Sequence, residues 1–256
     1  MRRCGRQDFL DDRARQLVFV PDAAHAVQLG LVSHGVFMDR ALELFPADYW
    51  RYCVIADAPE SDDADFTWEQ FAATVNKDLA NNFGNFVSRT LKLAAKHFGC
   101  EVPSGGEPGP CEDHLRSECK QTLAAYRTHL GNLEFRKAVQ ELRRLWPLGN
   151  ACLDKRAPWS LVREDRTQAA VVLRTAVNLT RIYGIAARPL ISFIAERLLD
   201  ALHLSGEERH SSLARLGDDL GAPLTPGRTF EVPPILFERI DDRQVAALRE
   251  KVGGDK

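Results

Sequence analysis

The sequence lacks the features that mark membrane, metal-binding and disulfide-stabilised proteins. No apolar run approaches the ~20 residues that span a bilayer, and Asp8, Asp11 and Asp12 stand where a signal peptide needs an apolar core. Neither a C-x-x-C pair nor an H-E-x-x-H segment occurs. We therefore predict no metal site, no membrane partner and a cytoplasmic chain whose six cysteines are free thiols, mostly packed.

Helical periodicity dominates what is present. The strongest helix is predicted over residues 67–98, where apolar residues recur at steps of three and four. Further helices are predicted over 113–129, 133–153, 168–184 and 191–204, and shorter ones over 38–44, 46–55 and 243–251. No segment in the central region alternates regularly as a strand would. The sequence therefore predicts an all-α fold, an antiparallel helix bundle with irregular N- and C-terminal segments.

The expected organisation has four segments. An irregular N-terminal segment covers residues 1–35, and a junction covers 36–65, including a turn at 58–63. The bundle covers 66–205, with a linker of proline and glycine at 102–110. A tail with short helices covers 206–256, and its stretch 230–237 is too rich in proline for a bundle helix.

The polar face of the long helix contains residues that weaken a helix. Asn81, Asn82 and Asn85 lie within five positions, together with Gly84, and asparagine side chains compete with the helix for backbone hydrogen bonds. Asn85 and Arg89 are spaced i, i+4, so they share a face. An amide and a guanidinium can read the edge of an unpaired base. A solvated helix face without function is the alternative.

A second segment carries an aromatic ring fixed by proline. Trp159 follows Pro158 directly, near a helix end and close to Lys155 and Arg156. An exposed indole flanked by positive charge can stack a base of single-stranded RNA. A wedge that packs the loop onto the bundle is the alternative for Trp159. Trp50, Trp68 and Trp146 lie on apolar helical faces, so we predict that they are core residues.

The charge distribution is uneven. The net charge is −2, which argues against binding that needs many phosphate contacts. Between residues 121 and 190, however, twelve basic and five acidic residues give a net charge of +7. Such a region indicates either a local electrostatic footprint for a polyanion or a set of solvated helix faces.

Several segments resemble the methionyl-tRNA synthetase family. Residues 78–90 (DLANNFGNFVSRT) are similar to the first bundle helix of its anticodon-binding domain, and residues 149–159 (GNACLDKRAPW) to its second signature. Residues 45–68 resemble the junction between catalytic core and bundle, and residues 233–240 resemble the C-terminal tail. The resemblance extends over about residues 35–251.

The resemblance implies a role for each signature. In that family the asparagine and arginine of the first signature and the tryptophan of the second read the CAU anticodon. These positions are Asn85, Arg89 and Trp159 here, and Pro158 fixes the ring. Asn150 and Asp154 are further candidates for anticodon binding. The implied partner is methionine tRNA, and DNA is not an expected partner.

The catalytic signatures of the family are missing from this sequence. It has no H-I-G-H-like motif and no K-M-S-K-S loop, and its first lysine is Lys77. No upstream ammonium can therefore neutralise triphosphate charge as an adenylate forms. We expect no catalytic residue and no cofactor on this chain, since ATP and methionine would bind the family's catalytic domain. Alone it should not charge tRNA. A helical interaction or structural module, and one half of a split synthetase with a separate catalytic chain, are the alternatives.

Overall fold

The structure is a computed structural model that describes residues 38–57, 66–209, 216 and 224–252. The chain divides into two compact units, one formed by residues 1–76 and 239–256 and the other by residues 77–238. The predicted boundary at residue 66 falls within the first unit. The irregular segment predicted at 1–35 and the turn predicted at 58–63 lie outside the described residues.

The first unit is built around an aromatic cluster. Its helices are α3 (Met38–Leu44), α4 (Ala47–Ala56), α5 (Trp68–Thr74) and α14 (Asp242–Val252). Trp50 packs on Phe71 with ring centroids 4.4 Å apart, and its Nε1 donates to the carbonyl of Ala41 at 2.7 Å. Asn76 accepts from the backbone N–H of Ile240 and donates to its carbonyl, which anchors the residues that lead into α14.

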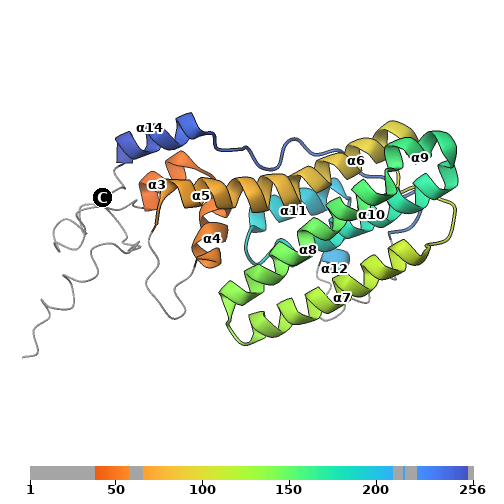
Figure 1. Ribbon diagram of the computed structural model, residues 1–256, viewed down its shortest axis with the longest axis horizontal. Helices are drawn as coiled ribbons and strands as arrows, with labels where there is room; N and C mark the ends of the chain where they lie inside the picture. Colours follow the sequence, from red (N-terminus) through yellow and green to blue (C-terminus); the bar gives the residue numbers. More distant parts are fainter. Residues whose placement is uncertain (1–37, 58–65, 210–215, 217–223, 253–256) are drawn as a thin grey trace, which may run out of the picture. The chain divides into compact units, whose positions relative to one another are not determined.

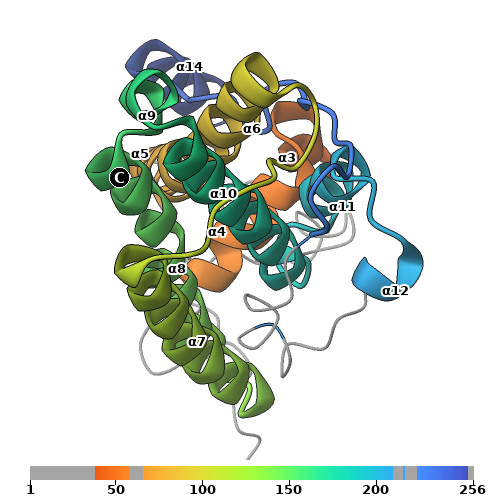
Figure 2. The same cartoon turned by 90° about the vertical axis from the view of Figure 1, so that its right-hand side faces the viewer.

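The other helices follow one another with short connections. They are η1 (Val75–Gly84), α6 (Asn85–Phe98), α7 (Pro110–Gly131), α8 (Phe135–Arg156), α9 (Pro158–Glu164), α10 (Arg166–Ala187), α11 (Ser192–Ala201) and α12 (Gly206–Arg209). Helices α7 and α8 form a hairpin, and α10 lies among α6, α8 and α11 (Figures 1 and 2). Almost every residue of α10 after Gln168 is buried. In the part of the chain that the structure describes, the extended pairing is limited to a bridge between Glu101 and Thr229. The predicted all-α fold is confirmed.

Two helices begin where the sequence predicted loops. The linker predicted over 102–110 ends one residue early, because Pro110 occupies the first position of α7, where no backbone N–H is needed. Glu112 reinforces this start by accepting from the N–H of Gly109 at 3.0 Å. Helix α9 was missed, since Pro158 also occupies a first helical position. The short α12 lies at the start of the tail in which short helices were expected.

Helices α6 and α8 pack through a close contact at Gly149. Gly149 of α8 lies so close to α6 that an added Cβ would stand 2.5 Å from Cε2 of Phe86. The hydroxyl of the buried Tyr183 accepts from the N–H of Gly149 at 3.0 Å and donates to the carbonyl of Leu145 at 2.7 Å. These are the two groups that an α-helix pairs with each other. Burial raises the pKa of Tyr183 well above its usual value, so the hydroxyl stays a donor.

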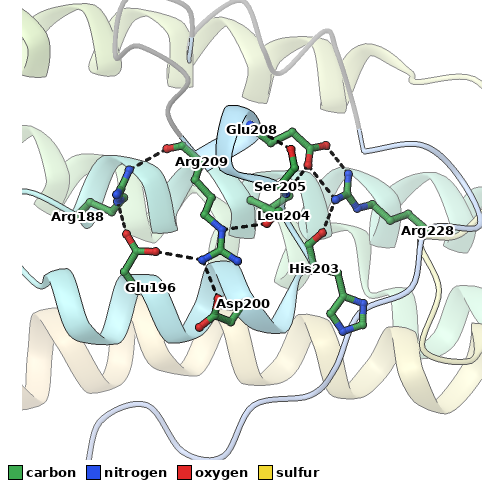
Figure 3. A network of polar contacts seen from close by, with 9 residues as sticks. All are labelled: Arg188, Glu196, Asp200, His203, Leu204, Ser205, Glu208, Arg209 and Arg228. Carbon is green, nitrogen blue, oxygen red and sulfur yellow. Dashed lines mark hydrogen bonds and ion pairs between the residues drawn. The ribbon is translucent and has the colours of Figure 1, made fainter.

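A polar network ties α12 and the C-terminal segment to the end of α11 (Figure 3). Arg209 binds Glu196 and Asp200 at 3.2 and 2.6 Å, and Arg188 binds Glu196 at 2.6 Å. Arg228 pairs with Glu208 and donates to the carbonyl of His203. Its hydrogen bond lowers the pKa of Glu208 from 4.5 to about 2.

The segment after Arg228 runs along the second unit without helix, as predicted for 230–237. Phe230 donates from its backbone to the carbonyl of Cys100 at 2.9 Å. Phe230 and Phe237 are buried, and Phe237 meets Phe83 edge to face at 5.8 Å. Within the described residues, no helix is both long and apolar enough to cross a membrane.

Candidate nucleic-acid interface

The candidate residues come from three helices of the second unit. Asn85 and Arg89 lie on the first turns of α6, Asn150 and Asp154 lie on the last turns of α8, and Pro158 and Trp159 open α9. Each pair on α6 and α8 has the i, i+4 spacing that places both side chains on one face.

The helix before α6 is wound as a π-helix over Val75–Gly84. Such wide turns are rare and often occur at functional sites, and this one coincides with the asparagines that disfavour an α-helix. The carbonyl of Asn82 accepts from Nδ2 of Asn150 at 2.9 Å. Gly84 ends the wide turns where an added Cβ would stand 3.2 Å from both Leu79 O and Phe237 Cδ2. The π-helix thus positions Asn150 against the start of α6.

The amide of Asn150 joins the two helices. Its Oδ1 accepts from Nδ2 of Asn85 and from Nη1 of Arg89, each at 3.4 Å. Nη2 of Arg89 binds Oδ1 of Asp154 at 2.6 Å. The side chains of Arg89 and Asp154 are 32% and 62% exposed, so the cluster is open to solvent. Four side chains that can read a base edge therefore meet at one place.

Trp159 stands beside this cluster. Ala157 has φ 43°, a left-handed conformation that both ends α8 and begins α9. Pro158 is buried in the first position of α9 and Trp159 is 43% exposed. The guanidinium carbon of Arg89 lies 5.4 Å from the centroid of the indole. The ring is therefore presented at the surface next to the polar cluster.

The following helix holds α9 in place. Asp165 caps α10 by accepting from the N–H of Gln168 at 3.0 Å. Arg166 donates to the carbonyl of His97 at 2.6 Å and lies over the ring of Phe98. The end of α6 and the start of α10 are thereby joined, which fixes the position of α9.

A groove lies next to the indole. It has a volume of about 210 Å³ and is lined by Arg89, Lys92, Leu93, Lys96, Leu153 and Trp159. Sequence reasoning missed the two lysines and the two leucines. The spacing of Lys92 and Lys96 from Arg89, three and seven residues, could have found them, since it places all three cations on one face of α6.

Much of the basic region is engaged within the protein. Arg143 binds the buried Asp78 at 2.7 Å, and Arg156 pairs with the buried Glu112 at 3.3 Å. Arg174 donates to the carbonyls of Gly105 and Gly106. These residues therefore serve the fold, and the net charge of the segment overstates the positive surface.

The cysteines that the structure describes form no disulfide, and Cys53 and Cys119 are buried. Cys100 is exposed, so the packing expected of the cysteines does not extend to it. Burial raises the pKa of both Cys119 and Cys152 to about 12, so these thiols stay protonated and unreactive.

The comparison with known families decides the identity. Residues 102–256 match the family model described as the anticodon binding domain of methionyl tRNA ligase. The chain belongs to this family. Residues 32–91, which include Asn85 and Arg89, match the model of tRNA synthetases class I (M). The resemblance seen in the sequence is confirmed, and the chain contains an anticodon-binding domain of this family.

Individual members of the methionyl-tRNA ligase family are similar over most of the chain. Methionine--tRNA ligase 1 of Acaryochloris marina is 48% identical over 86% of this chain and 39% of that protein. Methionine--tRNA ligase of Streptomyces avermitilis is 44% identical over 86% of this chain and 38% of that protein. The chain thus spans about two fifths of the length of these relatives.

A solved structure has the same fold. The apo form of Mycobacterium tuberculosis methionyl-tRNA synthetase superposes with a TM-score of 0.71 over 85% of this chain and 46% of that chain. Its sequence identity is 23%, so this likeness supports the helical architecture alone.

Proposed function

We propose that this chain binds methionine tRNA by recognising the CAU anticodon. In this proposal Trp159 stacks one splayed base, while Asn85 and Arg89 read base edges. Asn150 and Asp154 orient these groups, and Pro158 fixes the ring. Membership of the anticodon-binding family supports the proposal.

One geometric observation carries it. An exposed indole lies beside a solvent-open cluster of two amides, a guanidinium and a carboxylate, supplied by three different helices. Sequence-specific RNA recognition uses unstacked bases that stack on aromatic rings and are hydrogen-bonded at their edges. A helix bundle that serves only packing does not require such a cluster at its surface.

The first prediction concerns Trp159. Trp159→Ala should weaken binding of a synthetic RNA stem-loop carrying CAU by about 1–3 kcal/mol, because base–aromatic stacking contributes that amount. This corresponds to a loss of about 5- to 150-fold in affinity. Titration of the purified chain with fluorescently labelled RNA measures it.

Two variants control this experiment. Phe193→Ala removes another exposed aromatic ring, 64% exposed on α11, and should leave the affinity for RNA unchanged. Trp159→Phe keeps a stacking surface and should retain part of the affinity. Equal binding by the wild type and Trp159→Ala would defeat the proposal and favour a helical interaction module instead.

We further propose that the chain contributes tRNA recognition but not amino-acid activation. The support is the sequence itself, which has no H-I-G-H-like motif, no K-M-S-K-S loop and no lysine before Lys77. ATP and methionine would then bind elsewhere. A separate catalytic chain is a second candidate partner, and the C-terminal tail would supply its docking surface. Ile235 is 72% exposed and follows the exposed Pro234, whereas Leu236 and Phe237 are buried, so this tail offers a small apolar surface for docking.

A further inference from the structure

The groove beside Trp159 combines an apolar floor with two unengaged ammonium groups. Leu93 of α6 and Leu153 of α8 supply the floor, and Trp159 of α9 supplies a wall. Lys92 and Lys96 line the same groove and are both exposed. Neither lysine forms an ion pair or hydrogen bond with any residue that the structure describes.

This state contrasts with that of the neighbouring cation. The guanidinium of Arg89 is bound by Asp154 at 2.6 Å and by Asn150, so its charge is balanced locally and its donors are directed at the polar cluster. Lys92 and Lys96 continue the same face of α6 away from that cluster. Their charges are therefore available to a ligand, whereas Arg89 is already partly engaged.

The spacing of the lysines fits an extended strand. Four residues of α-helix advance by about 6 Å, so the two ammonium groups form a short row along α6, comparable to successive phosphates of an unpaired strand. Lysine binds phosphate as a point charge and imposes little geometry. At 210 Å³ the groove is below the ~300–1,000 Å³ typical of drug-sized ligands, which suits one nucleotide rather than a cofactor.

We infer that this groove, with Lys92 and Lys96, is a sequence-independent binding track for the RNA segment next to the base stacked on Trp159. The lysines bind consecutive backbone phosphates, and Leu93 and Leu153 contact the sugar or the face of the adjacent nucleotide. This inference rests on the proposed function and adds to it a division of roles. The Asn85–Arg89 cluster reads base identity, while the groove supplies affinity that depends on salt.

The test is the salt dependence of RNA binding by the full chain. The variant carries Lys92→Gln and Lys96→Gln, and the probe is the CAU stem-loop, with a second stem-loop of altered anticodon. Losing two single-strand phosphate contacts should flatten the plot of log affinity against log salt by about 1.4. Affinity should fall on the order of tenfold at about 50 mM salt and converge with that of the wild type as salt rises. The ratio of affinities for the two RNAs should stay the same.

A matched control removes equal charge elsewhere. Lys120→Gln with Arg127→Gln changes two exposed residues of α7 and should leave the slope unchanged. If this pair flattens the slope as much as the α6 pair, net charge explains the effect and the inference is wrong. An unchanged slope in the α6 pair, with a binding wild type, overturns this inference alone. A wild type that binds neither RNA overturns the proposed function as well. Circular dichroism melting checks that all variants remain folded.

Discussion

Arg89 makes three contacts through one guanidinium. One nitrogen binds Asp154, another binds Asn150, and the planar group lies over Trp159. A planar fork with five donors can satisfy these directions together, while a lysine ammonium cannot. In the free protein this group therefore covers part of the indole, and an arriving base must use the remaining face or displace the cation.

Arg89→Lys keeps the positive charge but removes the planar guanidinium that makes these three contacts. We expect weaker binding of the CAU stem-loop by about 1.5–3 kcal/mol, the value of a hydrogen bond to a charged group. The free energy of unfolding should change by less than ~1 kcal/mol, because exposed ion pairs contribute little. Parallel RNA titration and urea unfolding measure the two effects. Full affinity in the lysine variant would show that only the charge at this position matters.

Single residues were predictable where their chemistry is unusual in context. Trp159, Asn85 and Arg89 were selected because a tryptophan after proline and asparagines inside a helix are poorly explained by packing. The structure brings all six candidate residues to one place, and their role in binding RNA stays a prediction. The environment of Lys92 and Lys96 could not be predicted, because it depends on Leu153 and Trp159 from other helices.

Among the helices, α8 contains Pro147, which has no N–H to donate to the backbone ladder. The Tyr183 hydroxyl stands between the N–H of Gly149 and the carbonyl of Leu145, and side-chain insertion of this kind is a known cause of helix bending. The insertion is one residue before Asn150. The course of α8 at this point therefore determines where Asn150 meets α6.

Tyr183→Phe should lower the free energy of unfolding by about 1–3 kcal/mol, because a buried N–H loses its partner. Urea denaturation at constant m-value measures it. Tyr126→Phe is the matched control, since the buried Tyr126 hydroxyl only donates to the carbonyl of Ala186 at 2.8 Å. Its loss should be smaller. Equal losses would mean that the hydroxyl of Tyr183 has no special part in α8.

The existence of most helices followed from periodicity, but their ends did not. Asp165 caps α10 through a local contact of its side chain with the N–H of Gln168, the kind of helix start that a sequence can show. Pro110 and Pro158 were assigned to loops although both begin helices, because a proline fits either a loop or a first helical turn. The π-helix could not be predicted, since its wide turns are stabilised by contacts such as that of Asn82 with Asn150, 68 residues apart.

At the scale of the molecule, an ion pair between residues twenty positions apart fixes the segment around Arg228. Arg228 and Glu208 hold the segment after residue 224 to α12 (Figure 3). The pKa of Glu208 is lowered in the folded state to about 2, so the pair stabilises the fold above the ordinary value of 4.5. Its contribution is lost as the pH falls from about 4.5 towards 2.

Glu208→Gln should therefore lower the melting temperature at pH 7, and the difference from the wild type should shrink towards pH 2, where about half of the wild-type carboxyl is already protonated. The loss in free energy of unfolding should be below ~1 kcal/mol, because Glu208 is 37% exposed. Thermal melting across this pH range measures it. Glu207→Gln makes the same charge change on a neighbour without an ion pair to the described residues and should have little effect. A difference that is as large at pH 2 as at pH 7 would contradict the assignment.

The fold class was predictable from sequence because the helical pattern repeats along most of the chain. The charged surface was not. The net charge of residues 121–190 indicated either a local electrostatic footprint or solvated helix faces, but Arg143 and Arg156 are bound by Asp78 and Glu112. Each of these partners lies more than forty residues away in the chain, so their pairing depends on the tertiary structure.

The single left-handed residue between α8 and α9 has a consequence for how recognition can be tuned. Ala157 separates Asp154, which orients the reading groups, from Trp159, which presents the ring. Its two backbone torsions set the angle between α8 and α9 and therefore the distance between Asp154 and Trp159. A substitution at Ala157 that shifts those torsions would change the affinity for a nucleotide, although its side chain need not contact that nucleotide.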